Sequence, residues 1–90
     1  MDIKVNVPAV MLPLTKQQKV ITGNGSTIRD LIDNLEQGNP GIKDRLVSAD
    51  ELNRYVNIFV NEQDIRFSGK LEATVKAGDE ITILPAVAGG

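Results

Sequence analysis

The chain has 90 residues, of which 41% are apolar and 24% charged, and its formal net charge is −2. These values describe one small globular domain without a basic run that could neutralise nucleic-acid phosphates. Cysteine and histidine are both absent, which excludes disulfides, thiolate nucleophiles, thiolate or imidazole zinc sites and a Ser-His-Asp triad. No apolar run approaches the roughly 20 residues that cross a bilayer, and the N-terminus lacks a signal-peptide pattern. We therefore expect a soluble, cytoplasmic protein with no membrane or nucleic-acid partner.

The first 25 residues predict two paired strands. Apolar and polar residues alternate over residues 3–7, and Pro8 ends that strand. Residues 9–15 predict a loop or an irregular hairpin connection. Residues 19–22 predict a short second strand paired with the first, and Gly-Asn-Gly at 23–25 predicts a turn.

The clearest element is a helix that follows this turn. Thr27 can cap it, with Asp30 three residues on. Its apolar stripe has the spacing i, i+3, i+4 and i+7 and consists of Ile28, Leu31, Ile32 and Leu35. Gly38 suits the left-handed position after the helix, and Pro40 prevents the helix from resuming.

The second half of the chain predicts three more strands. We expect a short helical turn at 42–46 and then a loop at 48–54. A strand at 56–60 follows, closed by a polar turn at 61–64, and then a brief strand at 65–67. A tight turn at 77–79 leads into the last strand at 80–84. Leu71 and Val75 are expected to pack under a loop. The order β-β-α-β-β-β predicts an α+β domain in which one mixed sheet curls around one main helix, because a single apolar helix stripe needs one sheet face to cover it.

The last six residues, 85–90, form an apolar arm that ends in Gly89-Gly90. Neither glycine has a Cβ, so the backbone there can thread a narrow channel. Two glycines in the last two places arise by chance about once in 200 chains, and a frayed or truncated end is the alternative explanation. We expect a folded domain at 1–84 and a flexible C-terminal tail at 85–90, which extends to roughly 20 Å.

This pattern resembles a known family. The element order, the Asn61 turn after the third strand and the closing run at 75–90 resemble the ubiquitin-like sulfur-carrier proteins. That family includes the thiamin-pathway carrier, the small subunit of molybdopterin synthase and the carrier of thiocarboxylate-dependent cysteine biosynthesis. Residues 60–69 and the Ala-Val-Ala-Gly-Gly end look most like the cysteine-biosynthesis carrier. The resemblance implies the ubiquitin-like β-grasp fold.

The resemblance also implies a chemistry for the tail. A chain without cysteine cannot carry sulfur as a thiol, and the C-terminal carboxylate is the remaining group that fits. A ubiquitin-activating-like adenylating and sulfurtransferase enzyme would adenylate Gly90 with ATP and magnesium, and a sulfur donor would displace AMP to leave a thiocarboxylate. Gly89, Ala88 and Val87 would thread the partner's water-poor site. The chain itself would be no enzyme and would bind no cofactor or metal.

For the subfamily that it most resembles, the sulfur acceptor would be an activated serine derivative on a pyridoxal-phosphate-dependent cysteine synthase. A peptidase would then release the cysteine from the carrier. Three other functions stay open at this point: a modifier conjugated to lysine through Gly90, a permanent subunit such as that of molybdopterin synthase, and a plain binding module with an incidental Gly-Gly end.

A partner docking surface is expected beside the tail. Alternation puts Phe59 and Leu84 on the face of the sheet away from the helix, where exposed apolar side chains suit protein recognition. The alternative for Phe59 is that it closes the edge of the core beneath a loop. We expect Phe67 in the core and Arg66 on the solvated surface.

Two weaker signals have simpler explanations. Gly23-x-Gly25 before a helix resembles a phosphate-binding turn but lacks the later glycines and a following lysine, so we expect a plain turn. The helix acids Asp30, Asp33 and Glu36 could suggest a cation site, but without converging ligands they are expected to be solvated charges. Asp79 is expected to shape the turn before the last strand.

Overall fold

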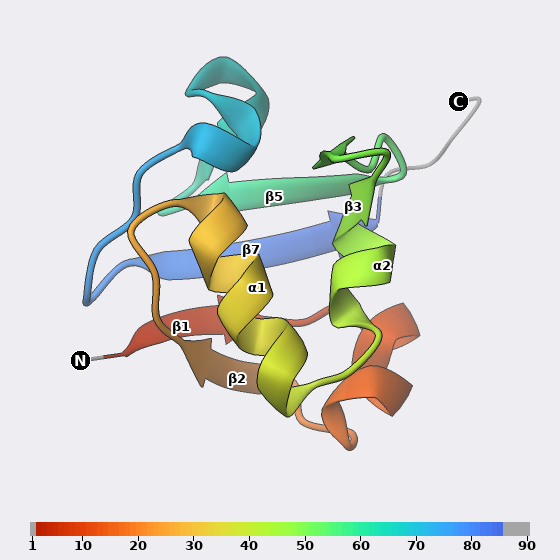
Figure 1. Ribbon diagram of the computed structural model, residues 1–90. Coiled ribbons are helices and arrows are strands. Elements are labelled where there is room, and N and C mark those ends of the chain that lie inside the picture. The colour runs from red at the N-terminus through yellow and green to blue at the C-terminus, as the bar shows by residue number, and fades with distance from the viewer. Residues whose placement is uncertain (1, 86–90) are drawn as a thin grey trace.

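The computed structural model describes residues 2–85 and is built around one five-stranded mixed sheet with a helix across its inner face (Figure 1). The elements in chain order are β1 (Ile3–Asn6), the 3-10 helix η1 (Ala9–Thr15), β2 (Val20–Gly23), α1 (Ile28–Gly38), α2 (Ile42–Leu46), β3 (Val47–Ser48), β4 (Glu51–Leu52), β5 (Val56–Val60), β6 (Gln63–Asp64), the 3-10 helices η2 (Ile65–Phe67) and η3 (Lys70–Glu72), and β7 (Glu80–Pro85). The strand order in the sheet is β2-β1-β7-β5-β6. β1 and β7 pair in parallel, and the other neighbours pair antiparallel.

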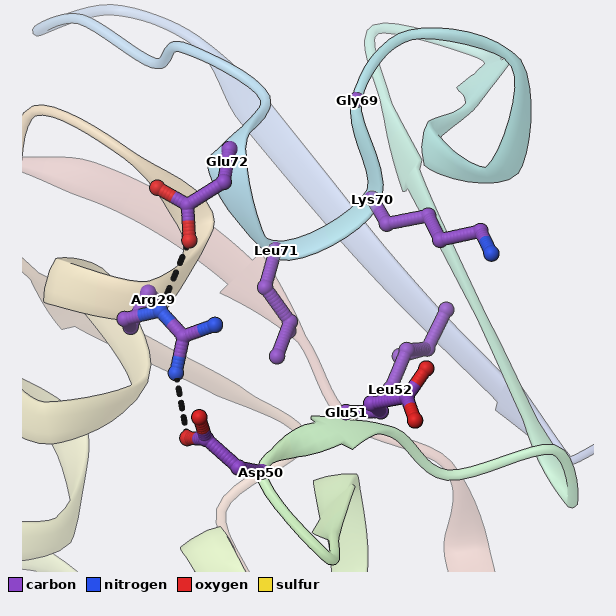
Figure 2. A pocket seen from close by; sticks show the side chains of 8 residues that line it. All are labelled: Arg29, Asp50, Glu51, Leu52, Gly69, Lys70, Leu71 and Glu72. Carbon is purple, nitrogen blue, oxygen red and sulfur yellow. Dashed lines mark hydrogen bonds and ion pairs between the residues drawn. The ribbon is translucent and has the colours of Figure 1, made fainter.

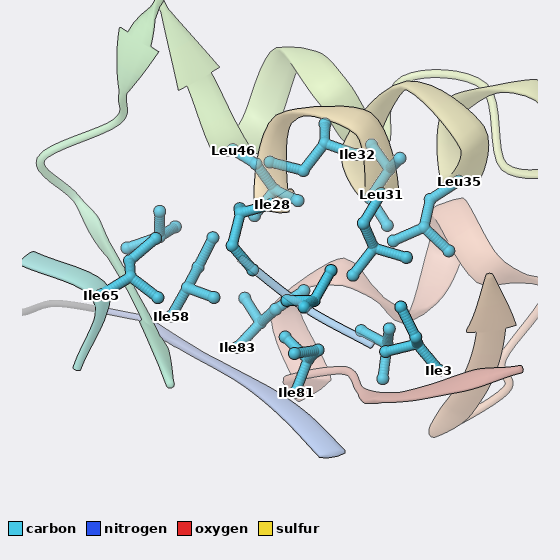
Figure 3. Packing of buried hydrophobic residues seen from close by; sticks show 14 of the residues in the cluster. Ile3, Ile28, Leu31, Ile32, Leu35, Leu46, Ile58, Ile65, Ile81 and Ile83 are labelled. Carbon is cyan, nitrogen blue, oxygen red and sulfur yellow. The ribbon is translucent and has the colours of Figure 1, made fainter. Parts of the chain in front are cut away.

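The core lies between α1 and the sheet face that α1 crosses. The predicted apolar stripe of α1 is fully buried, and Figure 3 shows it facing Ile3, Ile58, Ile81 and Ile83 of the sheet. Thr27 caps α1 as expected, because its hydroxyl accepts a hydrogen bond from the Asp30 backbone N–H at 3.2 Å. The register pairs Val5 with Ile81, and it pairs Ile58 with Ile83. The Thr27 cap therefore sets where α1 begins, and the spacing of its apolar residues sets which face of α1 packs on the sheet.

Residues 9–15, expected as a loop, form the 3-10 helix η1 despite Pro13. The segment is held to the core at both ends. Met11 is buried, and its N–H donates to Pro8 O at 3.0 Å. The buried Thr15 hydroxyl donates to Gln18 O at 2.7 Å. Tertiary burial of two side chains stabilises a helical turn that sequence spacing alone does not predict.

The prediction that Gly38 takes the left-handed position after the helix is wrong. Gly38 is the last residue of α1 and does not have a positive φ. The helix ends because Pro40 has no N–H to continue the ladder and keeps Asn39 out of the helical conformation, with φ −137° and ψ 73°. The backbone N–H and side-chain amide of Asn39 both donate to Leu35 O, at 2.8 and 3.2 Å. The left-handed glycine is Gly41, whose φ of 98° turns the chain into the predicted short helix α2.

Two expectations for the second half of the chain also change. Residues 48–54 are more than a loop, because β3 and β4 form a small hairpin with Val47 opposite Leu52. Residues 65–67 form the 3-10 helix η2, and the brief strand is β6, which pairs Gln63 with Val60 of β5. Elements of two or three residues carry too little periodicity to be distinguished from loops.

Gly25 packs against the first turn of α1. A Cβ built at Gly25 would lie 2.6 Å from the Leu31 backbone nitrogen, whereas one at Gly38 would meet nothing within 4 Å. The N–H of Ile28 at the start of α1 donates to Ala73 O at 2.9 Å, which occupies a donor that a phosphate would need. The turn expected at 23–25 is only partly right, because Gly23 is the last residue of β2 and pairs with Ile3, and the connection to α1 begins at Asn24. Close packing against α1 explains the glycine at position 25.

We expect Gly25→Ala to destabilise the fold by about 2–3 kcal/mol, because the added methyl group forces a backbone shift. For a domain of this size this lowers Tm by roughly 10–20 °C. Thermal unfolding followed by circular dichroism measures the effect. Gly38→Ala is the matched control and should leave Tm unchanged or slightly higher. Equal Tm values for the two variants would contradict the steric explanation.

Candidate functional site

β7 leads the chain toward the glycine pair. It lies between β1 and β5, so the strand that precedes the tail is paired on both sides. The last pair joins Pro85 to Val56, one residue beyond the expected end at Leu84. Because proline has no N–H to donate, the ladder ends there. Of the tail expected at 85–90, Pro85 belongs to β7 and the other residues lie outside the described residues. These include the predicted sulfur-carrying residue Gly90 and the threading residues 87–89, so their roles stay predictions.

The structure places Phe59 and Leu84 on the sheet face away from α1, as the alternation predicted. Their neighbours in sequence, Ile58 and Ile83, are buried on the opposite face. Phe59 is half-buried opposite Thr82, and Leu84 is 45% exposed. The two side chains occupy diagonal positions on adjacent strands, within reach of one another. They offer a small apolar surface directly before the tail, and docking of a partner on it stays a prediction.

Phe67, expected in the core, is 84% exposed. The Asp64 carboxylate accepts a hydrogen bond from the Arg66 N–H at 2.8 Å and starts η2 there. In this 3-10 turn Ile65 takes the buried position, and Phe67, two residues on, faces solvent. The expectation failed because it assumed a strand at residues 65–67.

Arg66 is half-buried rather than freely solvated, which corrects the second expectation for this segment. Its guanidinium donates to the Asn57 side-chain oxygen, and to Val56 O at 2.8 Å. Asn57 is opposite Leu84 in the register. Arg66 therefore fixes η2 against the end of β5 that borders the exposed Leu84.

Asn61 and Asp79 join the two turns that flank β5 and β7. The Asn61 side-chain amide donates to Asp79 Oδ1 at 2.9 Å, and its oxygen accepts from the Glu80 N–H at 2.9 Å. Asp79 Oδ2 accepts from the Lys76 N–H at 2.9 Å across the Gly78 turn. Asp79 thus shapes this turn as expected. The hydrogen bond from Asn61, followed by that from Lys76, holds the pKa of the Asp79 carboxyl below its usual value.

Asp79→Ala should cost about 1–3 kcal/mol of unfolding free energy at pH 7, because it removes the acceptor for two donors. Since the folded-state pKa of Asp79 is lowered, its contribution is present above the unfolded-state pKa and is lost as pH falls through the folded-state pKa. The difference from wild type should therefore shrink between pH 5 and strongly acidic solution. Urea titrations at a series of pH values measure this, with the exposed Asp2→Ala as control. A difference that does not change with pH would contradict the assignment.

A pocket of about 190 Å³ opens between α1, the β3–β4 turn and η3 (Figure 2). Arg29 lies inside it between two acids, donating to Asp50 at 2.7 Å and to Glu72 at 2.8 Å. The hydrogen bond with Glu72, then that with Asp50, raises the pKa of Arg29. Because Arg29 is already paired with both acids, we assign this pocket a role in folding: Arg29 connects α1, the β3–β4 turn and η3.

The helix acids do not converge. Asp33 pairs with Lys43 at 2.7 Å, and Glu36 accepts the backbone N–H groups of Gly41 and Lys43 at 3.0 and 2.9 Å. These contacts attach α2 to α1 and lower the pKa of Glu36. In the described part of the chain, no three acidic side chains lie close enough together to hold a metal ion. None of the helices between residues 2 and 85 has the length and apolar composition that crossing a bilayer requires.

Sequence reasoning did not single out a second group of exposed apolar side chains beside the end of β7. Val10 of η1 is 62% exposed, and Tyr55 before β5 is 47% exposed. Both flank a pocket that Pro85 also lines. Neither lies in a periodic segment, so pattern analysis had no signal for them. A lone tyrosine in a chain with three aromatic residues was the one available hint.

Residues 5–90 match the ThiS family, so the chain belongs to that family. This confirms the expected membership of the ubiquitin-like sulfur carriers and the α+β β-grasp fold. Within the family, the chain is 44% identical to the sulfur carrier protein CysO of Mycobacterium tuberculosis, over the whole length of both chains.

Two solved structures support the same placement. A chain of the Amycolatopsis orientalis BexX/CysO complex superposes with a TM-score of 0.92 at 46% identity, covering 98% of this chain and 99% of the other. The Mycobacterium tuberculosis CysO structure superposes with a TM-score of 0.91 at 42% identity, covering 94% and 99%. The similarity extends over essentially the whole fold.

Proposed function

We propose that the protein is a sulfur carrier that serves cysteine biosynthesis, with the sulfur held as a thiocarboxylate at Gly90. The observation that carries this proposal is the position of the tail. The Gly89-Gly90 sequence comes four residues after Pro85, the last paired residue of β7, and β7 is paired on both sides. Full-length similarity to a sulfur carrier supports the same function.

The chemistry proposed at Gly90 has two steps. A carboxylate oxygen attacks the α-phosphorus of ATP, with magnesium held by the partner enzyme, and pyrophosphate leaves. A sulfide-level donor then attacks the acyl carbon of the mixed anhydride; the new carbon–sulfur bond replaces the carbon–oxygen bond to AMP. The thiocarboxylate is a soft nucleophile that transfers sulfur to a bound electrophile. For cysteine biosynthesis that electrophile would be an activated serine derivative held by a pyridoxal-phosphate-dependent synthase. The thiocarboxylate sulfur would replace the activating group on the serine β-carbon, which leaves a carrier–cysteine adduct at the Gly90 acyl carbon. A peptidase would hydrolyse this adduct to release the cysteine and restore the Gly90 carboxylate.

In this proposal the chain is a co-substrate, and the catalysis belongs to its partners. Among the described residues, a shifted pKa is found at Arg29, Glu36, Lys43 and Asp79, and each of these side chains is bound to another part of the chain. ATP, magnesium and pyridoxal phosphate are cofactors of the partner enzymes.

ATP turnover by the activating enzyme of the same organism tests the proposal. Exchange of labelled pyrophosphate into ATP should depend on this protein, and net AMP release should require both this protein and sulfide. AMP release that proceeds without sulfide, accompanied by covalent joining of Gly90 to lysine, would favour a protein modifier instead. No exchange at any protein concentration would contradict activation of the tail.

A further inference from the structure

A pocket of about 160 Å³ lies on the helix side of the sheet where β7 ends. Its lining comes from four separate parts of the chain: Pro8, Val10 and Met11; Arg45; Asn53, Tyr55 and Val56; and Pro85. In Figure 1, β7 ends on the side of the molecule where α2 and β3 lie. The face is opposite to that of Leu84, because successive side chains of a strand alternate.

The pocket has an apolar floor and a partly exposed apolar rim. Met11 and Val56 are buried at its base, whereas Val10 and Tyr55 leave 62% and 47% of their surface open. Two such side chains beside an exposed Pro85 form a local apolar patch rather than scattered single residues. Patches of this kind mark contact sites.

Two arginines border the patch. Arg45 lies in the last turn of α2 and lines the pocket, and the Arg54 guanidinium lies 5.2 Å from the centre of the Tyr55 ring. Between residues 2 and 85, the ion pairs within hydrogen-bond reach are those of Arg29 and Lys43, and neither rim arginine takes part in one. The rim therefore presents positive charge that an acidic group can pair.

The size of the pocket restricts its occupant. A cavity of about 150 Å³ holds one benzene ring, and pockets for metabolites start near 300 Å³. The space suits a single aromatic or branched aliphatic side chain. Such a side chain filling a pocket is the usual centre of a protein–protein contact.

The length of chain beyond Pro85 limits which protein can supply this side chain. Residues 86–90 span at most about 17 Å when extended. An enzyme that holds Gly90 in its active site must therefore bring its surface to within that distance of Pro85, which itself lines the pocket. In the proposed function the adenylating enzyme is the first protein to take up the tail, so its surface comes within reach of this patch.

We propose that this pocket receives an aromatic or branched aliphatic side chain of the adenylating enzyme, with an acidic residue of that enzyme paired to Arg45. This inference rests on the proposed function and extends it. The partner would hold both sides of the end of β7, with Leu84 on one face and the pocket on the other. The contact would position the tail for entry before any chemistry occurs.

Binding of the full-length protein to the activating enzyme, measured by calorimetry without ATP, tests the inference. Val10→Asp should weaken binding about tenfold or more, because it places a charge in the apolar contact. Arg45→Glu should weaken binding comparably and reduce its dependence on salt. Val20→Asp is the matched control, since Val20 is 44% exposed in the edge strand β2, on the face of the sheet opposite to the pocket, and it should bind like wild type. Circular dichroism verifies that each variant is folded.

Equal affinities for wild type and Val10→Asp would overturn the inference while leaving the proposed function intact. Tighter binding by Val10→Asp would also overturn it, because it would show that the pocket normally holds the chain's own tail. A wild-type dimer that Val10→Asp converts to a monomer would assign the pocket to a second copy. Failure of the proposed function gives a different result: wild type binds, but no thiocarboxylate forms with ATP and sulfide.

Discussion

Replacing Gly90 by alanine is expected to lower the rate of adenylation by about 100-fold while leaving Tm unchanged. The carboxylate must reach the α-phosphorus at the bottom of a narrow, water-poor site, and displacement of the reacting group by about 1 Å costs roughly two orders of magnitude. A methyl group on the last residue produces a displacement of that kind. The buried core lies within residues 3–83, so the substitution leaves folding untouched.

Pyrophosphate exchange with the activating enzyme, at saturating protein, measures this rate. The matched control is Gly38→Ala, which makes the same chemical change at an open helix end with no atom within 4 Å of the new Cβ. That variant should be adenylated like wild type. Adenylation of Gly90→Ala at the wild-type rate would remove the reason for a glycine at the reacting position.

The second large effect is expected at Leu84. Leu84→Ala should raise the protein concentration needed for half-maximal adenylation by about 10- to 30-fold, because truncating an apolar contact at the centre of an interface costs about 2 kcal/mol. The rate at saturation should change little, since Leu84 does not touch the reacting carboxylate. A kinetic titration of the protein separates the two quantities.

Val20→Ala is the control for Leu84, because Val20 is similarly exposed on the same face of the sheet but at its far edge. If both substitutions raise the half-saturating concentration equally, the effect belongs to the sheet in general and docking at the end of β7 is wrong. If neither does, the face around Phe59 and Leu84 is not the docking surface.

The sequence predicted the parts of this fold that depend on regular spacing. The α1 stripe, its Thr27 cap and the alternation in β5 and β7 follow from periodicities of 3.6 and 2, and these placed Phe59 and Leu84 on the outer face. The 3-10 helices η2 and η3, of three residues each, are too short for such a signal. Phe67 was misplaced for this reason, because a three-residue turn exposes a side chain that a strand would have buried.

The pocket beside Pro85 could not be predicted from spacing at all. Its residues come from η1, α2, the segment before β5, and the end of β7, and only the tertiary fold brings them together. Arg66 is a similar case, since its anchoring to Asn57 and Val56 depends on how η2 folds back on β5. Sites assembled from distant, non-periodic segments require the structure.

The intact mass of the protein tests the central claim most directly. The protein is incubated with its activating enzyme, ATP, magnesium and sulfide, or isolated from its own cells, and its mass is measured before and after proteolysis. The proposed function predicts a gain equal to the exchange of one oxygen for sulfur, located in the peptide that contains Gly90. An unchanged mass, or a Gly90 peptide joined to lysine, would contradict it.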